Sequence, residues 1–233
     1  MKLLAIETAT EACSVAVHVD GQVIERFEVA PRRHAELTLP WAGALLAEAG
    51  IARSALDAVA ISRGPGAFTG VRLAIAIAQG IALAIDRPLL ALSTLEVLAR
   101  RAPADAGMVL AAIDARMGEV YAGRFVRDGQ GRLLADAAEV VLAPQAMQLP
   151  GPGWYGVGTG FAAADGALAG SLGERLVGVD AQALPHAADL AMLAVAAWER
   201  GEAIAPEQVE PAYLRDNVAL TLAEQQALRE SRA

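Results

Sequence analysis

A pattern of three strands joined by short turns opens the chain and constrains its fold more than any other feature. An apolar run at residues 2–7 is followed by residues 13–19, where apolar side chains alternate with smaller or polar ones. Asp20 and Gly21 form a dipeptide typical of tight β-hairpin turns, and residues 22–29 continue as a third strand. The chain is therefore predicted to begin with an antiparallel sheet.

The same pattern recurs in the second half of the chain. Residues 108–114 resemble the opening strand, residues 119–126 resemble the second, and an Asp-Gly dipeptide follows. After the first copy, strands and helices alternate as in α/β folds. We therefore predict two lobes, at residues 1–102 and 103–233, with the C-terminal helix packing back toward the first lobe.

Two predicted helices of the first lobe carry more apolar surface than one sheet can cover. The first spans residues 34–49, and the second, residues 71–85, is apolar on nearly all sides. The second has about 15 residues, fewer than the roughly 20 that cross a membrane, so we interpret it as a buried helix and expect no membrane contact. The surplus apolar surface indicates a protein partner. We assign to this partner interface His34, Leu39, Ala42, Leu46, Ala74, Ala78 and Ile81.

Composition excludes several classes of function. The 233 residues are 55% hydrophobic and 20% charged, which supplies enough apolar material for a packed core. The formal net charge of -8 opposes contact with a phosphate backbone, so the chain alone is not expected to bind tRNA tightly. Cys13 is the only cysteine, which excludes an internal disulfide and a cysteine-rich metal site. Together with the lack of a signal-peptide pattern, this predicts a cytoplasmic protein.

A glycine-rich segment at residues 62–70 joins a predicted strand to the second helix. Free backbone amides at the start of a helix can hold an anion, so Gly64, Gly66, Thr69 and Gly70 are candidates for binding a cofactor. No P-loop lysine follows the last glycine, and a tight connection between strand and helix also needs glycine. We favour this structural interpretation.

Two acidic residues end the inner strands of the two copies. Glu7 and Asp114 are therefore expected to face each other across a cleft between the lobes, where paired carboxylates can orient a metal-bound phosphate or a water. The alternative is that each carboxylate caps the turn next to its own strand.

Other catalytic patterns find little support in the sequence. His18, His34 and His186 have no metal-ligand spacing, so no histidine-bound metal is expected. Ser62 and Ser93 have no nearby histidine or lysine, and no Gly-x-Ser-x-Gly turn is present, which argues against a nucleophilic hydrolase.

Several stretches resemble the TsaB (YeaZ) family of bacterial tRNA threonylcarbamoyladenosine synthesis. They are residues 4–16, residues 63–72 with the string Gly-Pro-Gly-x-Phe-Thr-Gly, residues 114–121, residues 211–215, and His34 at the start of the first helix. The resemblance implies an α/β, actin-like (Hsp70-like) ATPase fold whose two lobes derive from a duplicated antiparallel and parallel sheet unit.

The resemblance also implies a function. It is that of a non-catalytic scaffold or activator for threonylcarbamoyladenosine formation at position 37 of tRNAs that read codons starting with A. The implied partners are the homologous transferase TsaD, in a heterodimer, and the TsaE ATPase, with tRNA bound only through the complex and a homodimer formed by the isolated chain.

Catalytic and cofactor roles are not expected on this reading. The His-x-x-x-His metal motif of the transferase is reduced here to His34, so we expect an inactive paralogue without a metal. The first turn carries two carboxylates and no glycine, so we expect no bound nucleotide unless one lies at the junction with the partner. The alternative is a stand-alone enzyme of this fold, either a glycoprotease-type peptidase or a small-molecule kinase. A third reading is a self-sufficient homodimer.

Overall fold

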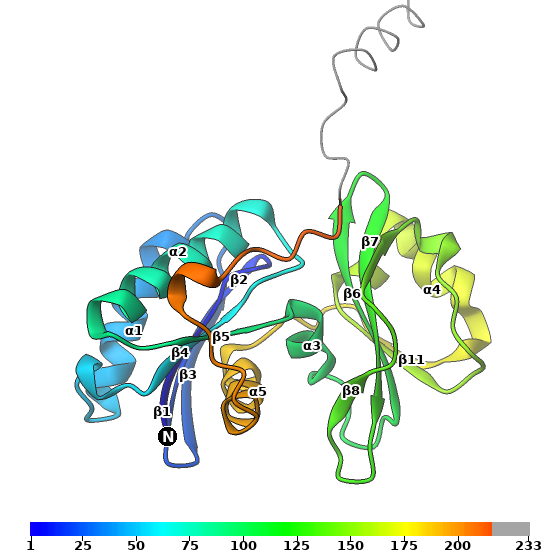
Figure 1. Cartoon of the computed structure of the whole chain (residues 1–233). Coiled ribbons are helices and arrows are strands. Elements are labelled where there is room, and N and C mark those ends of the chain that lie inside the picture. The colour runs from blue at the N-terminus through cyan, green and yellow to red at the C-terminus, as the bar shows by residue number, and fades with distance from the viewer. Residues whose placement is uncertain (216–233) are drawn as a thin grey trace, which may run out of the picture.

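The computed structural model describes residues 1–215 and arranges them around two sheets (Figure 1). The first sheet has the strand order β3-β2-β1-β4-β5. Its first three strands are antiparallel, and β4 and β5 run parallel to β1. The strands are β1 (Lys2–Glu7), β2 (Ala12–Val19), β3 (Gln22–Val29), β4 (Ala58–Ser62) and β5 (Leu89–Leu92).

The second sheet repeats this arrangement. Its order, β8-β7-β6-β10-β11, again has three antiparallel strands followed by two parallel ones, and β9 pairs with β7. The strands are β6 (Met108–Arg116), β7 (Glu119–Arg127), β8 (Leu133–Ala135), β9 (Val140–Leu142), β10 (Trp154–Val157) and β11 (Leu176–Asp180). The predicted α/β fold with two lobes from one duplicated unit is confirmed.

Helices cover both faces of the first sheet. On one face, α1 (His34–Glu48) and α2 (Phe68–Ile85) pack on the side chains of Leu4 and Ile6. On the other face, α5 (Ala187–Glu199) packs on Leu3 and Ala5. Because successive side chains of a strand point to opposite faces, burial on both sides explains why β1 is a continuous apolar run.

The second sheet is covered by shorter helices. Leu110 and Ala112 of β6 face α4 (Ala167–Leu172), and Val109 and Ala111 face α3 (Thr94–Ala99). The chain therefore crosses twice, because α3 precedes residue 102 but packs on the second sheet, and α5 follows that sheet but packs on the first. Short 3-10 turns lie at Arg53–Ala55, Pro144–Ala146, Thr159–Phe161, Ala163–Gly166, Gly173–Arg175 and Pro206–Gln208.

Helix α2 differs from its predicted form. It begins at Phe68, three residues earlier than predicted, and has 18 residues. By length and composition alone it passes as a candidate membrane span, and only 33% of its residues are buried. The prediction of a buried helix is corrected, because one side of α2 packs on the first sheet and the other side is open.

Candidate functional site

The glycine-rich segment packs directly on the first turn of the chain. The Ala67 N–H donates to the Ala9 carbonyl at 2.7 Å, and the Thr8 hydroxyl donates to the Gly70 carbonyl at 2.8 Å. A Cβ on Gly66 would lie 2.4 Å from the Ala9 oxygen, and one on Gly70 would lie 2.0 Å from the Thr8 oxygen. Two backbones in contact therefore require glycine at both positions.

The remaining candidates for binding a cofactor are placed differently. Gly64 has a φ of +106°, a conformation that side chains rarely adopt. Thr69 is exposed in the first turn of α2 and, with Gly66 and Gly70, lines the cleft between the lobes. The structural interpretation thus accounts for all three glycines, and binding of an anion by this segment stays a prediction.

Glu7 is fully buried at the end of β1. Its Oε1 accepts the Ala9 N–H at 2.7 Å, whereas its Oε2 and the adjoining Ser62 hydroxyl have no hydrogen-bond partner among the described residues. Burial raises the pKa of Glu7 to about 7, against the lowering effects of the neighbouring Ser62 hydroxyl and of the hydrogen bond from the Ala9 N–H. The buried carboxyl of Glu7 therefore stabilises the first turn through its hydrogen bond with the Ala9 N–H.

Asp114 lies on the cleft and also holds a turn. Its Oδ1 accepts the Arg116 N–H at 2.8 Å, and its Oδ2 pairs with the Arg116 guanidinium at 2.8 Å. Both carboxylates therefore cap the turns next to their own strands, as the alternative interpretation predicted.

The prediction that these two carboxylates face each other across the cleft is wrong. Glu7 alternates in step with Leu3 and Ala5, which face α5, whereas Asp114 alternates in step with Ala112, which faces α4. In the first sheet, α2 and α5 lie on opposite faces, and in the second sheet α4 and α3 do. Helices α2 and α4 occupy corresponding places, because each follows the fourth strand of its sheet. The two carboxylates thus sit one residue out of register, on non-equivalent faces.

The histidines have structural partners. His34 is half-buried, and its Nε2 lies 3.0 Å from the Thr10 carbonyl and 3.2 Å from the Ala12 carbonyl, so it fixes the first turn to α1. The Nδ1 of His18 lies 3.1 Å from the Met1 carbonyl. Within residues 1–215, no three His, Cys, Asp or Glu side chains are grouped to hold a metal ion.

The structure brings together three residues that sequence reasoning did not connect. The Ser14 hydroxyl donates to Glu25 Oε1 at 2.6 Å, and His186 Nδ1 lies 3.0 Å from Glu25 Oε2. The Ala187 N–H donates to Ser14 Oγ at 2.9 Å, and the Ala188 N–H donates to Glu25 Oε1 at 3.0 Å. Strands β2 and β3 therefore cap the N-terminus of α5.

This cluster contains the residue types of a hydrolytic triad in an order that does not work as one. Glu25 lies between Ser14 and His186, so the imidazole is not placed to take the serine proton. Burial opposes ionisation of Glu25, but hydrogen bonds from His186, Ser14 and the Ala188 amide outweigh it and lower the pKa of Glu25. No local signal predicts the cluster, because His186 is 161 residues from Glu25.

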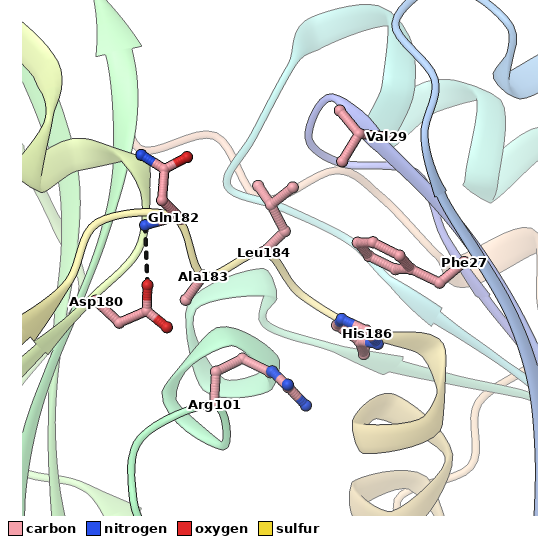
Figure 2. Close-up of a pocket in the computed structure, with 8 residues that line it drawn as sticks. All are labelled: Phe27, Val29, Arg101, Asp180, Gln182, Ala183, Leu184 and His186. Atoms are coloured by element: carbon pink, nitrogen blue, oxygen red, sulfur yellow. Dashed lines mark hydrogen bonds between the residues drawn. The ribbon is translucent and has the colours of Figure 1, made fainter.

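A small cavity of about 240 Å³ adjoins the capping cluster (Figure 2). The rings of Phe27 and His186 stack in it, with centroids 4.0 Å apart and planes 2° from parallel. Arg101 reaches toward it but pairs with Asp189 of α5 at 3.1 Å. The cavity is lined by Phe27, Val29, Arg101, Asp180, Gln182, Ala183, Leu184 and His186. These contacts join the two lobes to α5.

A larger cleft of about 1030 Å³ lies between the lobes. Its walls are the first turn and the start of α2 on one side and the turn between β6 and β7 on the other. Residues 211–215 line it, and the orange segment in Figure 1 passes from the first lobe to the second. This segment is fixed at both ends, because the Ala212 N–H donates to the Arg63 carbonyl at 2.8 Å and Arg215 pairs with Glu119.

Four of the seven residues assigned to the partner interface are core residues. They are Ala42, Leu46, Ala74 and Ala78, each at most 5% exposed and packed between the helices and the first sheet. The prediction that they lie outward is wrong. Ala74 and Ala78 lie on α2, which is apolar on nearly all sides and therefore has no periodicity from which its inner face can be recognised.

The outer face of the two helices consists of other residues. Leu39 is 54% exposed and Ile81 is half-buried, so these two predicted residues do lie on it. It also includes the exposed small or apolar residues Gly43, Ala47, Ala76, Gly80, Leu83 and Ala84. We call this set the outer face of α1 and α2.

Comparisons with known proteins give consistent similarities. The family model of tRNA N6-adenosine threonylcarbamoyltransferase, TsaD, matches residues 26–222. The tRNA threonylcarbamoyladenosine biosynthesis protein TsaB of Escherichia coli (strain K12) is 44% identical, over 94% of this chain and 96% of that protein. The TsaB protein of Haemophilus influenzae is 37% identical over 94% and 95%. The solved structure of YeaZ from Pseudomonas aeruginosa is 48% identical, with a TM-score of 0.84, over 91% of this chain and 99% of that one.

Proposed function

This chain belongs to the TsaB family of tRNA threonylcarbamoyladenosine biosynthesis proteins, and we propose on that premise that it is a non-catalytic partner subunit of a threonylcarbamoyl transferase. It has the actin-like ATPase fold of its family. The outer face of α1 and α2 supports the pairing role most strongly.

The argument for pairing is one of uncovered apolar surface. Helix α2 is apolar over most of its length, yet only 33% of its residues are buried, and Leu83 is 62% exposed. Apolar surface of this kind on a folded chain usually belongs to an interface. Exposed Gly43 and Gly80 have nothing within 4 Å of an added Cβ, so a partner helix has room to approach closely.

The proposed occupant is the homologous lobe of the transferase. The transferase family model matches most of this chain, so the transferase is expected to carry a related pair of helices. Two such pairs related by a quasi-twofold axis form a four-helix bundle that buries both outer faces. The isolated chain is proposed to pair with itself through the same face.

The hydrogen bonds made by the candidate catalytic side chains support a non-catalytic role. Glu7 and Asp114 cap turns, His34 binds backbone carbonyls, and Ser14 and His186 both contact Glu25. We propose that the transferase supplies the catalytic groups, that the TsaE ATPase joins the complex, and that any nucleotide binds at the subunit junction. We also propose that the complex acts in the cytoplasm.

Co-purification with the tagged transferase tests this proposal. Leu39→Glu puts an unpaired carboxylate into the proposed interface and is expected to reduce recovery at least tenfold. The matched control is Leu134→Glu, because Leu134 of β8 is 51% exposed and Leu39 is 54% exposed. Circular dichroism checks that both variants fold.

A second variant on the other helix guards against a local effect at Leu39. Leu83→Glu on α2 is expected to give the same loss of recovery as Leu39→Glu, because both side chains lie on the outer face. Folded Leu39→Glu and Leu83→Glu variants that both bind the transferase like the wild type would overturn the proposal.

A further inference from the structure

We propose that the cleft between the lobes is a binding surface for single-stranded RNA. The inference rests on the proposed function, in which the complex acts on tRNA, and it assigns part of the tRNA contact to this chain rather than to its partner. Two features carry it, a local excess of positive charge and a solvent-facing stack of planar side chains.

The cleft is positive in an acidic chain. Its lining includes four arginines, Arg32, Arg72, Arg116 and Arg215, against the two carboxylates Glu11 and Asp114, a formal excess of two positive charges. Arg215 is further paired with Glu119, which reduces this excess. The chain as a whole carries -8, so the lining of the cleft has the opposite sign of formal charge to the chain.

An aromatic and arginine stack stands at the rim of the cleft. The Arg72 guanidinium lies 3.3 Å from the centroid of the Phe68 ring and 5.2 Å from that of Tyr213, and it donates a hydrogen bond to the Tyr213 hydroxyl. Phe68 is 66% exposed and Tyr213 is 58% exposed. Unpaired bases stack on aromatic and guanidinium planes of this kind.

The placement of these groups favours an extended polyanion over a small ligand. Arg72 lies at the start of α2 on the first lobe, whereas Arg116 lies on the turn between β6 and β7 of the second. A small-molecule site encloses most of its ligand. Here the Arg116 side chain is 84% exposed and the two rings face solvent, so a strand that follows the rim reaches both walls.

Acidic peptides share the charge of RNA but not its chemistry. A peptide would neutralise the arginines, yet it has no bases to stack on Phe68 and Tyr213. The small charge excess also explains why the chain alone is expected to bind tRNA weakly. The cleft contributes a few contacts and becomes effective when the partner holds the rest of the tRNA.

The test measures the affinity of the assembled complex with the transferase for substrate tRNA at several salt concentrations. Arg116→Glu is expected to weaken binding about tenfold and to lower the salt slope by about one, since it removes a phosphate contact and adds a repulsive charge. Phe68→Ala is expected to weaken binding about fivefold at an unchanged salt slope, because stacking is uncharged.

Arg132→Glu is the matched control. Arg132 and Arg116 are both exposed, and each pairs at 2.8 Å with an aspartate of its own turn, Asp128 or Asp114. Arg132 follows β7 at the other end of the second sheet and does not line the cleft. This variant is expected to bind tRNA within twofold of the wild type.

The outcomes separate the inference from the proposed function. If the complex forms but the Arg116→Glu and Phe68→Ala variants bind tRNA as tightly as the wild type, the inference is overturned and the pairing role stays intact. Equal competition by polyglutamate and by single-stranded RNA also overturns it, in favour of an acidic peptide. Failure of the wild type to pair overturns the proposed function, and crosslinking of the same variants to tRNA at low salt then decides the inference.

Discussion

The two lobes share one strand order but differ in the helices that cover it. In the first lobe, α1 and α2 have 15 and 18 residues, whereas α4, which occupies the place of α2 in the second lobe, has six. Both lobes place glycines after the fourth strand, where they touch the backbone of the first strand or its turn. The duplicated unit thus fixes the sheet and its tight connection, while the helical layer is free to diverge.

This difference assigns different tasks to the lobes. The first lobe alone has two long helices with an exposed apolar face among the described residues. The second lobe instead presents a turn at the cleft, where Arg116 and the exposed Met117 stand out. Substitutions in one lobe, or on one side of one helix, therefore test this difference between the lobes.

The largest effect is expected for charge placed on the inner side of α1. Leu46→Glu buries a carboxylate in a site that is 5% exposed and is expected to cost about 5 kcal/mol of the free energy of unfolding. Leu39→Glu, on the outer side, is expected to change that free energy by less than about 0.5 kcal/mol. Urea denaturation measures both, and equal losses would show that the two sides of α1 are equally buried.

A smaller effect is expected at the glycines that the lobes have in common. Gly70→Ala puts a Cβ 2.0 Å from the Thr8 oxygen, and Gly158→Ala puts one 2.3 Å from the Ala112 oxygen. Each is expected to lower the free energy of unfolding by about 3 kcal/mol, because backbone must move. Gly43→Ala, with open space around it, is the control and should be neutral or stabilising. An unchanged free energy of unfolding in Gly70→Ala would contradict the inference that both lobes need glycine in the connection after the fourth strand.

An effect of similar size is expected from the buried carboxyl at the end of β1. Burial raises the pKa of Glu7 to about 7 from an ordinary value near 4.5, so the folded state holds a proton that the unfolded state loses. Stability is therefore expected to be highest below pH 4.5 as far as this group is concerned, and to fall by about 3 kcal/mol as the pH rises to 7.

Two variants, one in each lobe, test whether Glu7 is the source of this pH dependence. Glu7→Gln is expected to flatten the dependence of the unfolding free energy on pH between 4.5 and 7, because the titrating group is removed. Asp114→Asn, at the strand end of the second lobe, is measured in the same way as the control variant. Unfolding curves at a series of pH values measure this, and an unchanged slope in Glu7→Gln would exclude Glu7 as its source.

Local patterns predicted the sheets well and the helix faces poorly. The two-residue alternation and the Asp-Gly turns fix β1 to β3, because each signal lies within a few residues. Helix α2 is apolar on nearly all sides, so its sequence does not distinguish buried Ala78 from exposed Ala84. Helix α3 has six residues, too few to show a period, although Ser93 caps its start.

The contacts at the site depend on residues far apart in the sequence. The capping of α5 joins Glu25 to Ala188, which are 163 residues apart, and no pattern within either segment indicates the other. The stack of Arg72 and Tyr213 bridges 141 residues in the same way. The glycine segment was interpreted correctly as a tight connection, since the need for glycine there is itself local.

The double crossing of the chain has a consequence for synthesis on the ribosome. Among the described residues, one face of the first sheet, with Leu3 and Ala5, is covered mainly by α5, whose buried residues lie between 187 and 197. During translation from the N-terminus this face stays open until most of the second lobe has been made. The first lobe therefore matures last although it is made first, and the nascent chain offers an apolar sheet face to chaperones in the interval.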